Sequence, residues 1–263
     1  MLRDITIGQY YQAESVIHRL DPRVKLLGTF AYVISVFIFR NIPGFVLMTA
    51  FIWLCITLSK VPFKYMVKGL KAIALILFLT GFVNLFLTPG APVFEWKFIA
   101  ISKQGIYNTL YMITRLIYLV VGTSLMTLTT TPTRLTDGME TGLKFLNKLK
   151  VPVHEIAMMM SIALRFIPIL IEETDKIMKA QMARGADFES GNIFKRVKAM
   201  VPILIPLFIS AFKRADDLAI AMDSRCYNSG RKRTRMKQMK MTWRDAVAAS
   251  LMLVFCTGIF LIR

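Results

Sequence analysis

Residues 167–185 read IPILIEETDKIMKAQMARG, and residues 205–226 read IPLFISAFKRADDLAIAMDSRC. The two stretches share one pattern: an apolar segment marked by a proline, a mixed polar and apolar run, and an arginine between small residues. Arg184 stands near the end of the first copy and Arg225 near the end of the second. The repeat predicts two similar helices, each with an arginine near its end.

The prolines and arginines set the expected bounds of these helices. Because proline fits best in the first turn of a helix, we expect one helix to begin at Pro168 and the other at Pro206. From proline to arginine they would reach roughly 24 and 29 Å at 1.5 Å per residue. We interpret them as levers whose tips, Arg184 and Arg225, are held by something outside this chain.

Composition places the chain in a membrane. It is 55% hydrophobic over 263 residues and its mean hydropathy is +0.53, which does not fit an ordinary soluble domain. A helix needs about 20 apolar residues to span a bilayer. Five uncharged runs are therefore expected as spans, at 26–39, 41–59, 72–94, 116–133 and 246–262. Lys25, Arg40 and Arg263 flank the two short runs, and their long side chains can reach the membrane surface.

The distribution of basic residues predicts the orientation. Residues 134–240 contain 20 Lys and Arg, whereas the loops after the first and third runs contain few. The positive-inside rule then places the N-terminus in the cytoplasm and the C-terminus outside. The predicted fold is all-α and polytopic. It has a membrane domain of four spans (1–129), a cytoplasmic coupling domain of long amphipathic helices (130–241) and a last span (242–263). This topology accounts for the net charge of +18, so no nucleic-acid partner is expected.

Two apolar runs inside the expected coupling domain, 156–171 and 199–212, are harder to assign. Their uncharged stretches are short for a span, so buried or interfacial helices fit better, although the charge rule leaves a crossing open. Their methionines give a deformable apolar surface. Ordinary core and a surface that repacks against different partner helices are equally good interpretations.

An N-terminal motif, SVIHRLDPRVK, begins at Ser15. Asp21 and Pro22 fit the N-cap and first position of a helix, so the first spanning helix is expected to begin there. Arg23 and Lys25 are then expected at the lipid headgroups, as anchors of the topology.

His18, Arg115 and the three cysteines have simple interpretations. His18 is expected to be a hydrogen-bonded residue rather than a ligand, because no partner lies nearby in the sequence. Arg115 is expected at the outer interface, since 18 uncharged residues follow it. No pair of cysteines has metal-ligand spacing, so we expect no metal site.

The arginine tips point to docking. A basic residue in the last turn complements the helix dipole and Gly185 can end a helix, so one such tip alone is more often a cap. Two copies in a repeat favour a functional role. Arginine forms forked bonds to carboxylates, and a charged hydrogen bond contributes on the order of 1.5–3 kcal/mol. That is enough to hold a contact with a partner.

Over nearly its whole length the chain resembles the transmembrane coupling subunit (T component, EcfT/CbiQ-like family) of energy-coupling factor transporters, which are ATP-driven importers of vitamins and metal ions. The resemblance rests on the arrangement of spans, the two arginine motifs and the N-terminal motif. In the N-terminal motif the matching residues include Ser15, His18, Asp21, Pro22 and Arg23. Family members carry Ala-Arg-Gly or a close variant at the ends of two cytoplasmic coupling helices. Residues 183–185 match in full, whereas 224–226 keep only the arginine.

The resemblance implies partners and roles. Two ATPase subunits would bind ATP and Mg²⁺, so this chain is expected to need no cofactor and not to be an enzyme. The residues implied to dock on the ATPases are Ala183, Arg184, Gly185, Ser224, Arg225 and Cys226. A separate, exchangeable substrate-binding membrane subunit would deliver the vitamin or ion. The residues implied to contact it are Met158, Met159, Ile162, Phe166, Ile169, Ile203 and Leu207.

A membrane transferase and a secondary transporter are alternative functions. A membrane transferase is suggested by Asp216, Asp217 and Asp223, but no second acidic cluster completes a two-metal site. A secondary transporter would need polar groups within its spans and a repeat of spanning helices, whereas this repeat is expected in the cytoplasm. The chain also has no Gly-x-x-x-x-Gly-Lys-Ser/Thr loop, so we do not expect it to hydrolyse ATP itself.

Overall fold

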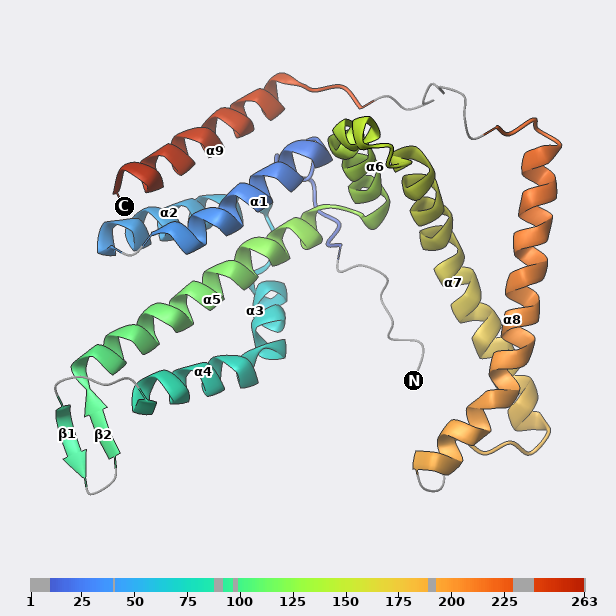
Figure 1. Cartoon of the computed structure of the whole chain (residues 1–263), viewed down its shortest axis with the longest axis horizontal. Coiled ribbons are helices and arrows are strands. Elements are labelled where there is room, and N and C mark those ends of the chain that lie inside the picture. Colours follow the sequence, from blue (N-terminus) through green and yellow to red (C-terminus); the bar gives the residue numbers. More distant parts are fainter. Residues whose placement is uncertain are drawn as a thin grey trace. The chain divides into compact units, whose positions relative to one another are not determined.

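The computed structural model describes residues 10–39, 41–87, 92–96, 99–188, 193–228 and 239–262. Within these ranges the chain is helical apart from one short hairpin, which confirms the predicted class (Figure 1). The helices are α1 (Pro22–Ile38), α2 (Ile42–Ser59), α3 (Phe63–Ala72), α4 (Ala74–Leu87), α5 (Lys103–Thr129), α6 (Pro132–Gly142), the 3₁₀ helix Leu143–Leu149, α7 (Val153–Ala183), α8 (Ile193–Asp223) and α9 (Trp243–Ile262). A small antiparallel hairpin joins α4 to α5. Its strands are β1 (Pro92–Trp96) and β2 (Ile99–Ser102).

The chain divides into two compact units. One, which we call the membrane unit, comprises Gly8–Gly142 and Met239–Arg263; the other, the coupling unit, comprises Met1–Ile7 and Leu143–Gln238. Contacts therefore group α6 with the membrane unit. The boundary predicted at 129/130 concerns sides of the bilayer and stays a prediction.

Among the described residues, four helices are long and apolar enough to cross a membrane: α2, α5, α7 and α9. A fifth span is possible if α3 and α4, which meet at a bend of 61°, count as one. This range agrees with the predicted number of about five, but the set differs. The apolar helix α1 has 17 residues, and α7 qualifies although its apolar run was expected to be too short.

The run 72–94, expected to hold the third span, is not one continuous helix, and a span in this region needs α3 and α4 together. Helix α4 begins at Ala74 and ends at Leu87, and Phe94 lies in β1. Pro92, the first residue of β1, has no N–H to offer a helix and cannot continue one. Arg40 and Arg263, expected to complete the short spans, lie outside the described residues.

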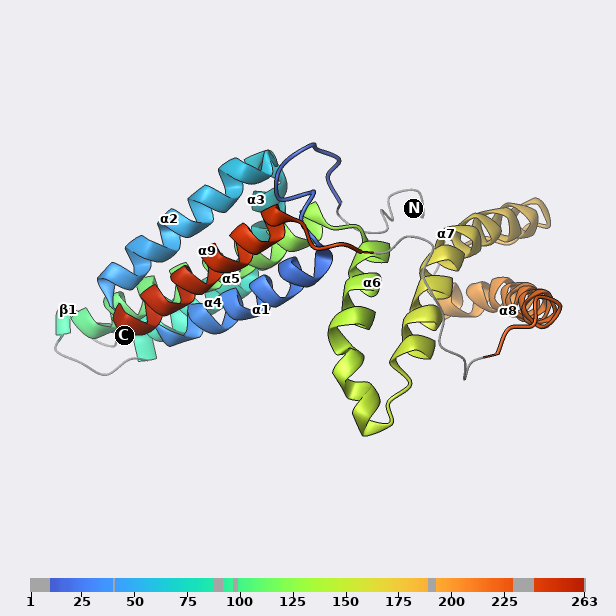
Figure 2. The ribbon, with the colours of Figure 1, turned by 90° about the horizontal axis from the view of Figure 1, so that it is seen from above.

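The core of the membrane unit lies between α1, α2, α5 and α9, which run side by side (Figures 1 and 2). Val36 and Phe39 at one end of α1 pack with Met48 of α2 and with Phe255 and Ile259 of α9, and all five side chains are buried. Close packing of this kind, rather than a hydrophobic drive, holds helices together in lipid.

A second buried cluster fixes the short helix α3. Val61 and Met66 pack against Val121 and Leu128 of α5. The lysines of α3 lie elsewhere on the helix, since Lys64 and Lys68 are exposed. An amphipathic helix with this distribution can lie along a membrane surface.

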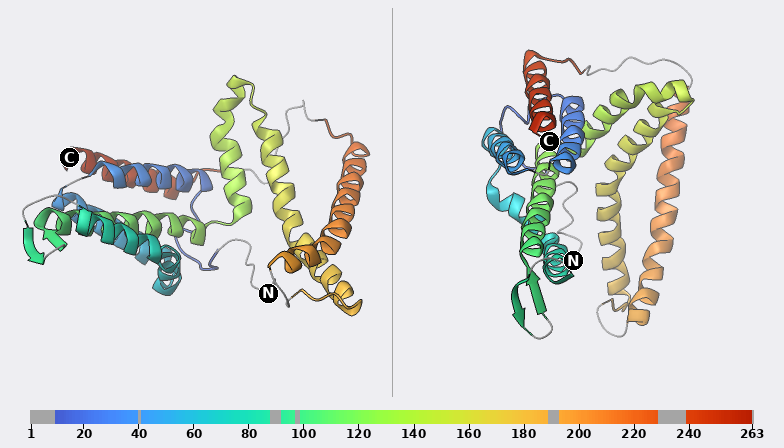
Figure 3. Two further views of the ribbon diagram at one scale, coloured as in Figure 1. Left: turned by 60° about the horizontal axis from the view of Figure 1, so that its bottom comes forward. Right: turned by 60° about the vertical axis from the view of Figure 1, so that its left-hand side comes forward.

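The prolines of the repeat lie inside helices, so the expectation that Pro168 and Pro206 begin helices is wrong. Pro168 is inside α7, and Pro202 and Pro206 are inside α8. Interior proline removes one hydrogen bond and bends a helix, and the first part of α8 runs at an angle to the rest (Figure 3). In apolar surroundings a full break would leave more backbone groups unpaired than a bend does.

Helices α1 and α5 run antiparallel, and each supplies a cation to the C-terminal end of the other. Lys25 Nζ in the first turn of α1 donates to the carbonyl of Thr129, the last residue of α5, at 2.9 Å and to Thr130 Oγ1 at 3.2 Å. Arg115 Nε on α5 donates to the carbonyl of Val36 in the last turn of α1 at 3.0 Å. These carbonyls have no partner within their own helix, and positive charge is favourable beside them.

The amino group of Lys25 turns inward to the end of α5, and the headgroup level predicted for this residue stays a prediction. Arg115 lies near the middle of α5, with its guanidinium 4.4 Å from the centre of the Phe37 ring. Its depth in the bilayer, predicted to be the outer interface, stays a prediction.

The cap on α5 gives a stability test. Lys25→Met keeps the length of the side chain but leaves the Thr129 carbonyl without its charged donor, and is expected to lower the free energy of unfolding by about 1.5–3 kcal/mol. Unfolding by increasing SDS in mixed micelles measures the change. Lys64→Met, at an exposed lysine of α3, serves as the matched control. Equal stability of the two variants would contradict the capping role.

Candidate docking sites at the helix tips

The first arginine tip is closed by its own backbone. The N–H of Gly185 donates to the carbonyl of Met182 at 2.9 Å, and the N–H of Ala186 donates to that of Gln181 at 3.0 Å. Gly185 has a φ of 87°, the left-handed conformation that glycine adopts without strain. This is a Schellman motif, and Arg184 is its C-cap residue.

The second tip has the same backbone pattern. The N–H of Cys226 donates to the carbonyl of Asp223 at 2.8 Å, and that of Tyr227 donates to Met222 at 3.0 Å. Cys226 takes the place of the glycine, with a φ of 54°. Arg225 therefore holds the same C-cap position as Arg184, although sequence identity between the two motifs is limited to the arginine.

Both arginine side chains are exposed. Within the described ranges, neither guanidinium makes a hydrogen bond or ion pair. The Schellman bonds satisfy carbonyls at each helix end, so the arginines are not needed as caps. The two tips are available to a partner.

Helices α7 and α8 run in opposite directions and are packed together (Figures 1 and 3). Because each arginine follows the C-terminal end of its own helix, the two tips lie at opposite ends of the pair. Arg214 Nη2 on α8 and Glu173 Oε2 on α7 form an ion pair at 3.1 Å that joins the helices.

This ion pair shows which faces of α7 and α8 meet. Ile162, Phe166 and Ile169 share a stripe with Glu173 at spacings of three and four residues, and all three are half-buried. Ile203 and Leu207 share the corresponding stripe with Arg214; Ile203 is buried and Leu207 half-buried. Five of the residues implied to contact the substrate-binding subunit thus lie on the stripes that join the two helices.

The exposed apolar side chains of the coupling unit lie mostly on other faces. Of the implied contact residues, Met158 is half-buried and Met159 is 57% exposed. The large exposed apolar residues of α8 are Phe194, Val197, Met200, Val201, Leu204, Ile205, Phe208, Ile209, Phe212 and Ile220. Most of them fall in the apolar run 199–212 identified in the sequence, from which only Ile203 and Leu207 were named as contacts.

The N-terminal motif forms a buried polar cluster in the membrane unit. His18 Nε2 lies 2.9 Å from the carbonyl of Tyr11, to which it can only donate, so Nδ1 accepts from the Ser15 hydroxyl at 2.7 Å. Ser15 and His18 are both buried. Burial lowers the pKa of His18 below 6.5, the Tyr11 bond opposes this shift, and the nearby charge of Lys25 adds to it. His18 is thus a hydrogen-bonded residue, as predicted.

Asp21 and Pro22 begin α1 as predicted. The Asp21 carboxylate accepts from the N–H of Arg23 at 2.9 Å, and Pro22 is the first helical residue. Arg23 is half-buried, with Nε 3.9 Å from the Asp21 carboxylate.

Asp245 is the residue of this cluster that sequence reasoning missed. Its carboxylate is buried and accepts from the N–H of Asp21 at 2.7 Å and from the N–H and hydroxyl of Thr242 at 2.8 and 2.7 Å. It thereby joins the start of α9 to the start of α1. The pattern Thr-x-x-Asp before an apolar run is a capping-box signal that could have identified it.

The acids considered for a transferase site do not form a metal centre in the described part of the chain. Asp216, Asp217 and Asp223 are exposed and belong to no group of three or more His, Cys, Asp or Glu that could hold a metal ion there.

These features define a class: a helical, multi-pass membrane protein with a long helical pair that ends in two exposed arginines. The family model described as CbiQ, cobalt transport protein, matches residues 13–236. The chain is 52% identical to the energy-coupling factor transporter transmembrane protein EcfT of Clostridium kluyveri, over 97% of this chain and 95% of the relative. It is 54% identical to that of Thermosediminibacter oceani (94% and 93% covered) and 46% identical to that of Bacillus subtilis over the whole of both chains.

The chain therefore belongs to the CbiQ/EcfT family, and it is a membrane subunit of an energy-coupling factor transporter. This confirms the resemblance that the motifs indicated. The roles of individual residues at the tips are not tested by this membership.

The buried His18 predicts a dependence of stability on pH. Because its pKa is lower in the folded chain than the ordinary value of 6.5, the folded state binds its proton less readily than the unfolded state. The contribution to stability is present above pH 6.5 and is lost as the pH falls through the folded-state pKa. SDS unfolding between pH 7.5 and 5.5 should show this slope in the wild type and not in His18→Gln. Glu14→Gln, which breaks an exposed ion pair with Arg19, should keep the slope. A slope that survives in His18→Gln would contradict the assignment.

The left-handed residues of the two Schellman motifs can be exchanged in opposite directions, from glycine to alanine in α7 and from cysteine to glycine in α8. Gly185→Ala places a side chain at a φ of 87° and is expected to destabilise the last turn of α7 by about 1 kcal/mol. Cys226→Gly removes a side chain from the left-handed region and is expected to change the last turn of α8 by less than about 1 kcal/mol. Hydrogen exchange of the Ala186 and Tyr227 amides, which close the two motifs, measures both. Equal protection of the Ala186 amide in wild type and Gly185→Ala would contradict the first prediction.

Proposed function

We propose that this protein is the coupling subunit of an ATP-driven importer, which transmits the motion of two ATPase subunits to a substrate-binding membrane subunit. The observation that carries the proposal is the pair of equivalent tips. Arg184 and Arg225 occupy the same backbone position after two long helices, and both side chains are exposed. The family and the energy-coupling factor names of the relatives support it.

The tips fit a carboxylate-lined groove on each ATPase. An arginine guanidinium binds a carboxylate through two parallel hydrogen bonds, which fixes orientation as well as distance. The residues on either side, Ala183 and Gly185 in the first tip and Ser224 and Cys226 in the second, are exposed. Small neighbours leave room for the partner to surround the arginine.

The coupling unit also has surface for the substrate-binding subunit. The exposed apolar face of α8 is too extensive for a helix in water and fits against other apolar helices. Met159 adds a flexible side chain on α7 that can adapt to different partners. We place the exchangeable subunit on this surface. The stripes that contain Ile162 and Ile203 would hold α7 and α8 together beneath this surface.

The proposal assigns the chemistry to partners. ATP and Mg²⁺ would bind the ATPases, and the vitamin or metal ion would bind the substrate-binding subunit. This chain would then act without a cofactor and without catalysis, with its N-terminus in the cytoplasm and its C-terminus outside.

The tips can be tested by substitution. Arg184→Ala and Arg225→Ala are each expected to weaken binding of the ATPases about 10- to 100-fold, which corresponds to one charged hydrogen-bond contact. The double variant should lose more than either single variant. Co-purification in mild detergent and uptake in cells measure binding and transport.

Arg165→Ala, at an exposed arginine within α7, is the matched control and should retain both. Arg184→Lys separates charge from geometry, because lysine keeps the charge but cannot form the forked bond. Unchanged co-purification and uptake in the double variant would refute the proposed role of the tips.

A further inference from the structure

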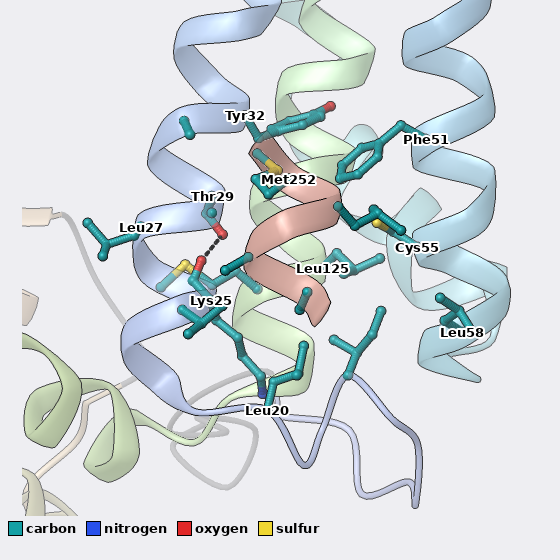
Figure 4. A pocket seen from close by; sticks show the side chains of 18 of the residues that line it. Leu20, Lys25, Leu27, Thr29, Tyr32, Phe51, Cys55, Leu58, Leu125 and Met252 are labelled. Atoms are coloured by element: carbon teal, nitrogen blue, oxygen red, sulfur yellow. Dashed lines mark hydrogen bonds between the residues drawn. The ribbon is translucent and has the colours of Figure 1, made fainter. Parts of the chain in front are cut away.

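The membrane unit contains an open-sided apolar cavity between α1, α2, α5 and α9. Its volume is about 540 Å³, within the range of roughly 300–1,000 Å³ typical of small-molecule sites. Its lining is almost entirely aliphatic and aromatic. Figure 4 shows Tyr32 and Phe51 toward one end, and Leu20 with the amino group of Lys25 toward the other.

The rim of the cavity faces the surroundings of the protein. Leu27 on α1 and Leu253 on α9 both line it and are 65% and 67% exposed. Leu58 of α2 lines it too and is also exposed. In a membrane this opening is reached from the acyl chains of the bilayer.

One end of the cavity is basic and lies at the level of helix ends. Arg244 lines the cavity and precedes Asp245, which binds the N–H of Asp21 at the start of α1. Arg244 is exposed and forms no hydrogen bond or ion pair with the residues that the structure describes. The adjacent Trp243 is 81% exposed, and exposed tryptophan is typical of the headgroup level of a membrane protein.

Gly28 gives an independent indication that the cavity is meant to be occupied. It lies inside α1 and lines the cavity, and a Cβ added to it would meet nothing within 4 Å. Gly122 on α5, by contrast, is needed for packing, because a Cβ there would overlap the Tyr32 ring. Glycine inside a helix costs about 1 kcal/mol relative to alanine. Among the residues that the structure describes, no contact explains this cost at Gly28, whereas space for a ligand does.

The size of the cavity identifies the kind of occupant. A spanning helix about 10 Å wide and 30 Å long fills roughly 2,400 Å³, several times the space present. An acyl chain is slender enough to enter, and a phosphate is the group that an unpaired arginine at headgroup level attracts.

We propose that this cavity holds one acyl chain of an anionic glycerophospholipid, with the lipid phosphate at Arg244. The site lies wholly in the membrane unit and does not rest on the proposed coupling function. It would fill the space between α1, α2, α5 and α9 that protein side chains leave open.

The test uses phosphatidylglycerol and phosphatidylcholine in equal amounts, added to the protein purified in mild detergent with its co-purifying subunits. Native mass spectrometry is expected to show one retained phosphatidylglycerol per chain. Gly28→Leu, at a position where an added Cβ meets nothing within 4 Å, puts a bulky side chain into the cavity and should lower this occupancy at least tenfold, since the acyl chain loses its apolar contacts. Ala50→Leu, at an exposed position of α2 that does not line the cavity, should have no effect.

Charge is tested separately. Arg244→Gln should reduce the preference for phosphatidylglycerol over phosphatidylcholine about fivefold, whereas Lys64→Gln, at an exposed lysine of α3 outside the cavity, should leave it unchanged. Phosphatidylglycerol with a photoreactive acyl chain should label Leu125 or Met252 of the wild-type cavity, which needs no variant.

Three results would overturn the proposal. Equal lipid retention in Gly28→Leu and Ala50→Leu would indicate bulk lipid. Labelling that avoids the cavity would place the lipid elsewhere. Loss of a co-purifying polypeptide from Gly28→Leu, with lipid content unchanged, would assign the cavity to a partner protein.

Discussion

Carbonyl groups at the ends of helices must be paired when no water is present, and this constraint shapes the membrane unit. Helices α1 and α5 meet it together. Lys25 of α1 reaches the end of α5, and Arg115 of α5 reaches the end of α1. The exchange works only if the two helices are antiparallel and in one register, so the same two bonds that satisfy the carbonyls also fix how the helices lie. Asp245 acts at the N-terminal ends of helices, where its carboxylate accepts hydrogen bonds from N–H groups at the starts of α1 and α9.

At the two exposed tips of the coupling unit, the carbonyls of the last turn are paired without a cation. At both tips the chain closes on itself through backbone bonds, in one case with Gly185 and in the other with Cys226 in the left-handed conformation. A basic side chain at a helix end is therefore ambiguous in a sequence. Lys25 and Arg115 donate hydrogen bonds that hold helices together. Arg184 and Arg225 make no such bond among the described residues and are exposed. The difference between a structural and a functional cation lies in whether the carbonyls beside it already have donors.

The sequence predicted what depends on local pattern. Asp21 and Pro22 give the start of α1, the arginine repeat gives two equivalent helix ends, and the family follows from the motifs. The sequence did not predict features that depend on contacts between residues far apart in the chain. Pro168 was expected to start a helix because proline is favoured there, but α7 begins earlier, at Val153, and continues through Pro168. The bond from Lys25 to the end of α5 was not expected, because its partner, Thr129, lies far along the chain.

The positions of Arg184 and Arg225 at the ends of the helical pair determine how it could transmit motion from the proposed partners. Because α7 and α8 are antiparallel, partners held at Arg184 and Arg225 would act on opposite ends of one helical pair, and a relative movement of the partners would turn or bend the pair as a whole. The Glu173–Arg214 ion pair and the apolar stripes beside it resist sliding of one helix along the other. Proline inside a helix weakens it locally, so bending of the pair would concentrate near Pro168 of α7 and near Pro202 and Pro206 of α8. Force applied at the tips would then be delivered where the helices can flex, which is where the exposed apolar face of α8 lies.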